Sequence, residues 1–208
     1  MVKRWPVLFA LMLAPAGAGA ATLSDARVGF SADRTLVVDG HTYTGKIWAM
    51  PGRERHEQAL QAFRPVFLLR ADSAIAEIVL PQLKTIVQFA VPAALQALVS
   101  PEIRKHATGE ESVAGIPTTK YAVAETTPEG SAAGTLWLSR DGILMRLVGT
   151  LTATGGKVTT VRWELKNVHI GPQPDALFEQ PSGFAKLPPE AVAPLLGLKL
   201  KSAKSTAR

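Results

Sequence analysis

Short runs of apolar or alternating residues, each ended by turn residues, recur along the whole chain. Such runs predict β-strands that follow one another as an antiparallel meander. The clearest turn is Asp39-Gly40, because this dipeptide favours the tight turn of a two-residue hairpin. About ten strands are expected, from eleven runs over residues 27–38, 41–50, 53–60, 65–70, 75–80, 84–91, 110–114, 118–125, 134–140, 143–153 and 157–170.

The run over 53–60 is mostly polar, unlike its neighbours. Charged residues are common on edge strands, so we expect this strand at an edge of the sheet, with Arg55-His56-Glu57 on a solvated face. Other strands carry apolar residues at successive positions, and therefore on both faces, as in Val66-Phe67-Leu68-Leu69. Such a strand can pack on helices through one face and line a cavity with the other, or it can lie with both faces in an ordinary core.

A few short helices are expected between and after the strands. Residues 92–99 predict one helix, and Ser100-Pro101-Glu102 has the residue types of a second helix start that leads to His106. Residues 175–179 form at most one helical turn, and residues 188–197 can form another. The chain is therefore mainly β (α+β), and a long meander of this kind either closes as a barrel or stays open as a half-barrel.

The first 20 residues have the pattern of a secretory signal peptide. A basic pair, Lys3-Arg4, precedes the apolar run Val7–Ala14 and the small residues Ala18-Gly19-Ala20, so we expect cleavage after Ala20. The apolar run is much shorter than the roughly 20 residues that span a bilayer, so no transmembrane span is predicted. With no Cys in the chain, there is none to acylate as in a lipoprotein. We expect a free periplasmic protein.

Composition favours one domain that is stabilised by its core. The absence of Cys excludes disulfides, a thiol nucleophile and a thiolate metal site. We expect one domain over residues 21–187 and a C-terminal tail over 188–208 that is partly disordered. The net charge of +6 falls to +4 once Lys3 and Arg4 are removed, and basic residues are spread along the chain. Such a distribution does not favour a nucleic-acid partner.

The residue types that carry catalysis do not occur in catalytic patterns. The histidines lie far apart, and none has the spacing of a helical metal-binding motif. The segment Gly130–Gly134 lacks the spacing of a nucleophile elbow. We therefore predict a non-catalytic protein without metal or cofactor. The four histidines are His41, His56, His106 and His169.

Several turn-and-strand motifs resemble exported proteins of the LolA-like superfamily, which sorts lipoproteins to the outer membrane. The likeness covers most of residues 28–187. It implies an open half-barrel closed by helices, which in the carrier members shields acyl chains as they cross the periplasm. The long N-terminal helix of the carriers is not expected before the first strand here. The motifs are Phe30-Ser31-Ala32-Asp33, Thr44-Gly45-Lys46, Gly109–Gly115 with Thr119-Lys120-Tyr121, Leu136-Trp137-Leu138-Ser139 with Asp141-Gly142-Ile143 and Arg146, and Asn167–Pro174 with Leu177-Phe178-Glu179 and Pro181.

Two functions of different classes remain open. The first is a carrier that holds a lipid, or the acyl chain of an acylated protein, in the concavity of the sheet, with burial of apolar surface as the driving force. The second is an envelope module that binds a protein partner as a peptide added to a sheet edge. Strand parity selects candidate lining residues for the first, and these are Trp48, Met50, Phe67, Leu69, Val87, Phe89, Leu136, Leu138 and Trp163.

Overall fold

A computed structural model describes residues 26–59, 64–71, 75–90, 105–128 and 130–192. These residues form one sheet of twelve strands, in the order β12-β6-β5-β4-β3-β2-β1-β11-β10-β9-β8-β7. The strands are β1 (Phe30–Val38), β2 (His41–Met50), β3 (Arg53–Gln58), β4 (Val66–Arg70), β5 (Ile75–Leu80), β6 (Thr85–Ala90), β7 (Lys105–Val113), β8 (Ile116–Thr127), β9 (Gly130–Ser139), β10 (Leu144–Ala153), β11 (Val158–Ile170) and β12 (Ala185–Leu187). The short helices are η1 (Pro81–Leu83), η2 (Asp175–Phe178) and α3 (Pro189–Val192).

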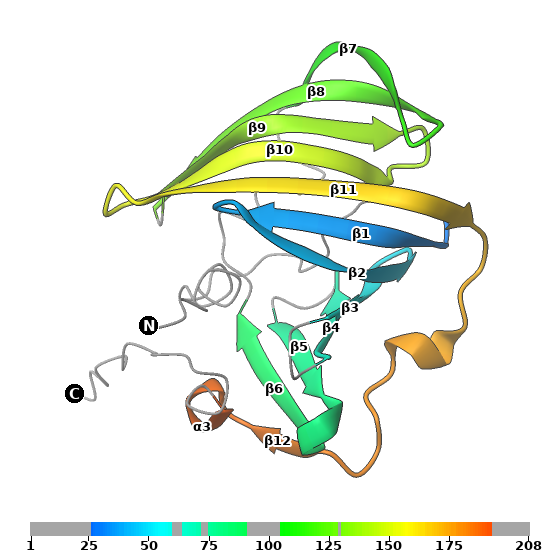
Figure 1. The fold of residues 1–208 in the computed structure, drawn as a ribbon, viewed down its shortest axis with the longest axis vertical. Helices are drawn as coiled ribbons and strands as arrows, with labels where there is room; N and C mark the ends of the chain where they lie inside the picture. Colours follow the sequence, from blue (N-terminus) through cyan, green and yellow to red (C-terminus); the bar gives the residue numbers. More distant parts are fainter. Residues whose placement is uncertain (1–25, 60–63, 72–74, 91–104, 129, 193–208) are drawn as a thin grey trace.

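The sheet consists of two meanders that meet in the middle. Strands β1 to β6 pair in chain order, as do β7 to β11, and the antiparallel pairing of β1 with β11 joins the two sets. The two ends of the sheet, β7 and β12, do not pair with each other, so the sheet stays open. Strands β7 to β11 arch over β1 and β2, while β3 to β6 turn away from them (Figure 1). The prediction of a mainly β, open half-barrel is confirmed.

The turn at Asp39-Gly40 fixes the register of the first hairpin. Both residues have positive φ, 47° and 79°, as the mirror-image turn of a two-residue hairpin requires. Asp39 also ties this hairpin to β11, because its carboxylate Oδ1 accepts a hydrogen bond of 2.8 Å from the backbone N–H of Thr160. One local motif therefore sets a strand pairing and supports the contact between the two meanders.

The two faces of the sheet bury different cores. We call the face that carries Phe30, Ala32 and Arg34 the inner face, and the opposite one the outer face. A large core lies mainly on the inner face. A smaller core on the outer face of β4 to β6 packs against Phe184, which lies in the segment that follows β11. Strands β4 and β5 are therefore apolar on both parities because protein covers both of their faces.

The polar strand over 53–60 is not an edge strand, so that prediction is wrong. Strand β3 pairs with β2 on one side and with β4 on the other. His56 on it is only 2 % exposed, which also contradicts the predicted solvated face. In a meander, each strand lies between the strands that precede and follow it, and this rule outweighs the polarity of β3.

Three other boundaries differ from the prediction. Strand β7 begins at Lys105, so His106 lies in a strand and not at the end of a helix. The short strand β12 was not predicted; it pairs in parallel with β6 and brings the total to twelve strands. Of the helix expected over 188–197, the structure shows the four residues Pro189–Val192. The single turn expected over 175–179 is confirmed as η2.

Some predictions lie outside the described residues. They are the signal peptide with its cleavage after Ala20, the helix over 92–99, the second helix start at Ser100-Pro101-Glu102 and most of the tail over 188–208. In the part of the chain that the structure describes, no helix is both long and apolar enough to cross a membrane.

Candidate binding site

Six of the nine predicted lining residues lie together on the inner face. Residues that pair directly across antiparallel strands share a face, so the register assigns each side chain to one side of the sheet. The six come from four different strands and are mostly buried; Trp163, for example, is 5 % exposed. They are Phe67 and Leu69 on β4, Val87 on β6, Leu136 and Leu138 on β9, and Trp163 on β11.

Trp48 and Met50 lie on the outer face, so they cannot line the same surface as the other six. Trp48 instead contacts the guanidinium of Arg55, whose Cζ lies 6.0 Å from the ring centroid. Arg55 in turn donates a hydrogen bond of 3.0 Å to the carbonyl of Leu177 in η2. Trp48 therefore supports the docking of η2 on the outer face. The remaining candidate, Phe89, pairs in the backbone register with Ala76 of β5.

A buried polar group interrupts the apolar inner face beside Trp163. Arg34 on β1 and Gln58 on β3 flank Gly45 of β2, and the Nη2 of Arg34 donates a hydrogen bond of 2.6 Å to the Oε1 of Gln58. Gly45 permits this arrangement because a Cβ there would lie 1.9 Å from the carbonyl oxygen of Glu57. The close approach of β2 and β3 therefore depends on a residue without a side chain.

Two further polar residues of β3 extend this group along the inner face. The Nε2 of His56 lies 2.9 Å from the Oε2 of Glu54, and both side chains are 2 % exposed. The imidazole meets the indole ring of Trp163 edge to face, with 5.7 Å between ring centroids. Burial lowers the pKa of His56, and the contact with Glu54 opposes that shift only in part. The ring is therefore neutral at pH 7.

Burial also lowers the pKa of Arg34 to about 10, while the charge of Glu54 opposes the change. Arg34 thus remains protonated at pH 7. Its guanidinium lies over the ring of Trp163, with Cζ 5.4 Å from the centroid. We call Arg34, Glu54, His56 and Gln58 the inner polar cluster. It combines one fixed cation, one carboxyl group and a neutral imidazole within an apolar surface.

Sequence reasoning missed the inner polar cluster because both alternating sets of side chains on β3 are polar. Glu54, His56 and Gln58 alternate with Arg55 and Glu57, so polarity alone cannot tell the buried side from the exposed one. The usable signal was the position of the strand in the meander. A strand between β2 and the apolar β4 is central, and its polar residues must then find buried partners.

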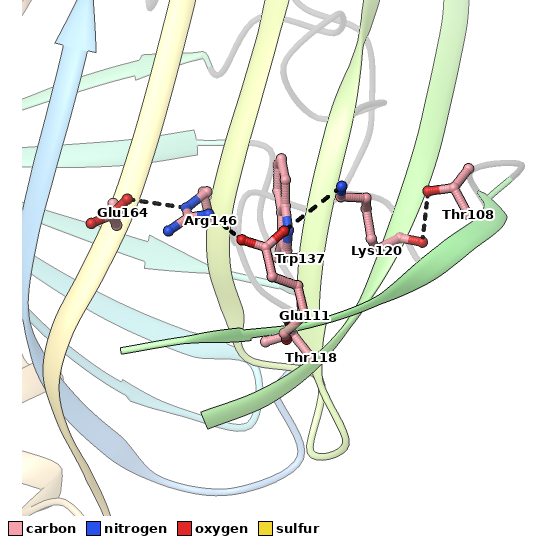
Figure 2. A network of polar contacts seen from close by, with 7 residues as sticks. All are labelled: Thr108, Glu111, Thr118, Lys120, Trp137, Arg146 and Glu164. Atoms are coloured by element: carbon pink, nitrogen blue, oxygen red, sulfur yellow. Dashed lines mark hydrogen bonds and ion pairs between the residues drawn. The ribbon is translucent and has the colours of Figure 1, made fainter. Parts of the chain in front are cut away.

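A second polar network crosses the outer face of the other meander, from β7 to β11 (Figure 2). Glu111 is its centre: its carboxylate accepts hydrogen bonds from the Nε1 of Trp137 at 2.8 Å and from the Nη1 of Arg146 at 2.9 Å. Arg146 also donates from Nε to Glu164 at 3.0 Å. The Nζ of Lys120 lies 3.7 Å from Glu111 and 5.4 Å from the centroid of the Trp137 ring.

The hydrogen bond from Trp137, followed by the contact with Arg146, lowers the pKa of Glu111. Every polar partner of this carboxylate named above lies on another strand, namely β8, β9 or β10. The network therefore holds the edge strand β7 against its neighbours. Its groups are partly exposed and mutually paired, which favours a structural role over a binding one.

Strand β7 leaves one backbone edge open. Among the described strands, it pairs only with β8, and seven of its nine residues are exposed. A hollow of about 510 Å³ adjoins the turn between β7 and β8. Six of its seven lining residues are of polar or charged type. The lining residues are Glu110, Glu111, Ser112, Pro117, Thr118, Thr119 and Arg140.

A metal centre finds no support in the described part of the chain. No group of three or more His, Asp or Glu side chains is placed there to hold an ion. In the described polar clusters, Glu77 accepts a hydrogen bond from Gln180, and Glu111 and Glu164 accept hydrogen bonds from Arg146.

Comparison with known proteins gives a likeness of fold. No family model matches the chain, and no curated protein matches it. Among solved structures, it is similar to an uncharacterised conserved protein from Thermus thermophilus, with 12 % identity, a TM-score of 0.50 and coverage of 78 % of this chain and 91 % of that one. It is also similar to the LolA superfamily protein NE2245 from Nitrosomonas europaea, with 8 % identity, a TM-score of 0.40 and coverage of 74 % and 91 %.

A further similar structure is the Pseudomonas aeruginosa MucA/MucB complex, with 19 % identity and a TM-score of 0.46. The match covers 75 % of this chain but 57 % of the other, so the chain spans a little over half of that protein. The match with a TM-score of 0.50 shows a likeness of fold between this chain and the Thermus thermophilus protein.

Proposed function

We propose that this protein is an exported, non-catalytic binding protein that holds a lipid or another acyl chain against the inner face of its sheet. The observation that carries the proposal is the set of apolar residues on the inner face, which lie on β4, β6, β9 and β11, on both sides of the inner polar cluster, in a sheet that does not close. An apolar chain laid along this surface would gain about 25 cal/mol for each Å² removed from water.

The burial of this surface determines how a ligand would bind. Phe67, Leu136 and Trp163 are each at most 5 % exposed, so a ligand would have to replace contacts that already bury them. The binding free energy is then a difference between two buried states, and binding requires the inner face to open first. Slow association that does not rise in proportion to ligand concentration is the expected kinetic sign.

The three tryptophans of the described residues provide a test of which face binds. Trp163 lies on the inner face, while Trp48 and Trp137 lie on the outer face. A fatty acid brominated along its chain quenches indole fluorescence only by contact. We expect it to quench the wild-type protein and the Trp48→Phe variant, and to lose most of its effect on Trp163→Phe. Equal quenching of the Trp163→Phe variant would place the ligand elsewhere.

Native mass spectrometry of protein purified without detergent complements this test. A stoichiometric lipid adduct supports the carrier function and identifies the class of cargo. Protein that carries no lipid and is not quenched by the brominated acid contradicts it.

The open edge of β7 favours a second candidate function, the binding of an extended peptide as an added strand. The nine residues of β7 offer enough backbone for a peptide of similar length. Hydrogen exchange distinguishes this from the first proposal. A peptide partner would slow exchange of the outward amides of β7, whereas an acyl chain would protect residues of the inner face. Unchanged exchange in β7 with every partner tested rules out the peptide function.

A further inference from the structure

We propose that Arg34, His56 and Gln58 form a site for the carboxyl group of a fatty-acid-like ligand. This inference rests on the proposed function, since it assigns the polar end of the ligand whose apolar chain would lie on the inner face. It gives the binding protein a preference among lipids and not only a general affinity for them.

The first argument is the set of buried polar atoms without partners. Among the residues that the structure describes, none forms a hydrogen bond with the Nε of Arg34, the Nδ1 of His56 or the Nε2 of Gln58. The three side chains are 5 %, 2 % and 2 % exposed. Buried polar groups in native proteins are nearly always paired, and each one left unpaired destabilises the fold. Three in one cluster point to a partner that binds there.

The second argument is the chemistry that these atoms leave open. The Nε of Arg34 and the Nε2 of Gln58 are N–H donors. The neutral ring of His56 donates from Nε2 to Glu54, which leaves Nδ1 as an acceptor. The three atoms without hydrogen-bond partners are therefore two donors and one acceptor. A carboxylic acid matches this set, because its carbonyl oxygen accepts and its hydroxyl donates.

The third argument is charge. The cluster holds the cation Arg34 and the carboxyl group Glu54, so it has no excess positive charge to balance a doubly charged phosphate monoester. A carboxyl group that brings its own proton adds no net charge, whether the proton stays on the ligand or passes to the Nδ1 of His56. Buried charges are stable only when they are paired in this way.

The surroundings of His56 restrict which groups can take part. Among the described residues, the charged side chains that face it are Glu54 on its own strand and Arg34 on β1. The neighbouring strands offer apolar side chains there: Ile47 on β2, Phe67 on β4 and Trp163 on β11. A carboxyl group at the cluster would thus have its acyl chain beside apolar residues.

The test compares two probes with the same chain, hexadecanoic acid and hexadecan-1-ol, by displacement of an uncharged fluorescent lipid from the whole mature protein. The hydroxyl group of the alcohol can form hydrogen bonds with fewer of these three atoms. We expect the acid to bind at least about tenfold more tightly than the alcohol to the wild-type protein. In Gln58→Leu the ratio should fall by about fivefold, with the affinity for the alcohol retained.

Arg34→Met provides a second variant, in which the ratio should fall further, and Arg146→Met is its control. Arg146 contacts Trp137 on the outer face much as Arg34 contacts Trp163 on the inner face. The control should keep the wild-type ratio. Comparison of the two probes on the wild-type protein needs no variant, so a poorly folding variant does not weaken the test.

The outcomes separate the two proposals. If neither probe binds, the proposed function fails, and the carboxyl site fails with it. If both probes bind the wild-type protein equally, the acyl-chain function stands and the carboxyl site is refuted. The same refutation follows if Gln58→Leu and Arg34→Met keep the wild-type ratio of affinities.

Discussion

The guanidinium of Arg34 lies over the indole ring of Trp163 on the inner face, with 5.4 Å between Cζ and the ring centroid. Arg146 lies over Trp137 on the outer face at 5.3 Å. The two pairs have the same chemistry but different solvent access, since Arg34 is 5 % exposed and the side chain of Arg146 is 22 % exposed. They therefore allow burial to be varied while the contact is held constant.

The Arg34→Met substitution should destabilise the protein far more than Arg146→Met. Removing Arg34 deprives Gln58 of its hydrogen bond and removes the positive charge that interacts with the buried Glu54, which costs about 3–5 kcal/mol in comparable cases. The partly exposed pairs of Arg146 contribute about 1 kcal/mol or less. Urea denaturation of both variants measures the difference. Equal losses would show that the inner polar cluster has solvent access that the structure does not show.

Gly45→Ala should lower the free energy of unfolding by about 3 kcal/mol, because the new Cβ would meet the carbonyl of Glu57 and force β2 away from β3. The same shift would separate Arg34 from Gln58. Gly155→Ala is the control, since a Cβ at Gly155 has no atom within 4 Å and its φ is not in the left-handed region. Thermal unfolding of the two variants tests this, and similar midpoints would contradict the close approach at Gly45.

The local part of the fold was predictable from the sequence, and the long-range part was not. Asp39-Gly40 identified the first hairpin because the turn depends on these two residues alone. The pairing of β1 with β11 joins Val38 to Val161, and no local pattern encodes a contact across that distance in the chain. Strand β12 was missed for a similar reason, because its three residues become a strand only by pairing with β6.

The candidate site was predictable only in its apolar part. Parity selected Phe67, Leu136 and Trp163, and the register places all three on the inner face. Alternation within one strand does not show which of its two faces lies on the same side of the sheet as a given face of the next strand. Trp48 was therefore predicted to line the site, although the register puts it on the outer face. The pairing of strands is needed to decide this, and only the structure provides it.

Stability should fall with decreasing pH because of His56. Burial holds the pKa of its folded form below the ordinary value of 6.5, so the unfolded chain takes up a proton that the folded one resists. This contribution is fully present above pH 6.5 and is lost as the pH falls from there toward the lowered folded pKa, with a slope of up to about 1.4 kcal/mol per pH unit. Urea midpoints at several pH values between about 7 and 5 would measure it. A His56→Gln variant should have a flatter profile, and an unchanged profile would assign the effect to other groups.

Trp48→Ala should loosen η2 and leave the affinity for an acyl chain unchanged. The ring contacts Arg55, and Arg55 holds the carbonyl of Leu177, so removal of the ring weakens the docking of η2 by about 1 kcal/mol. Hydrogen exchange should become faster for the amides of Asp175–Phe178, with little change in β9 or β11. Trp163→Ala should show the opposite pattern, with ligand affinity reduced and η2 unaffected. A loss of ligand affinity in Trp48→Ala as large as that in Trp163→Ala would mean that the ligand contacts the outer face.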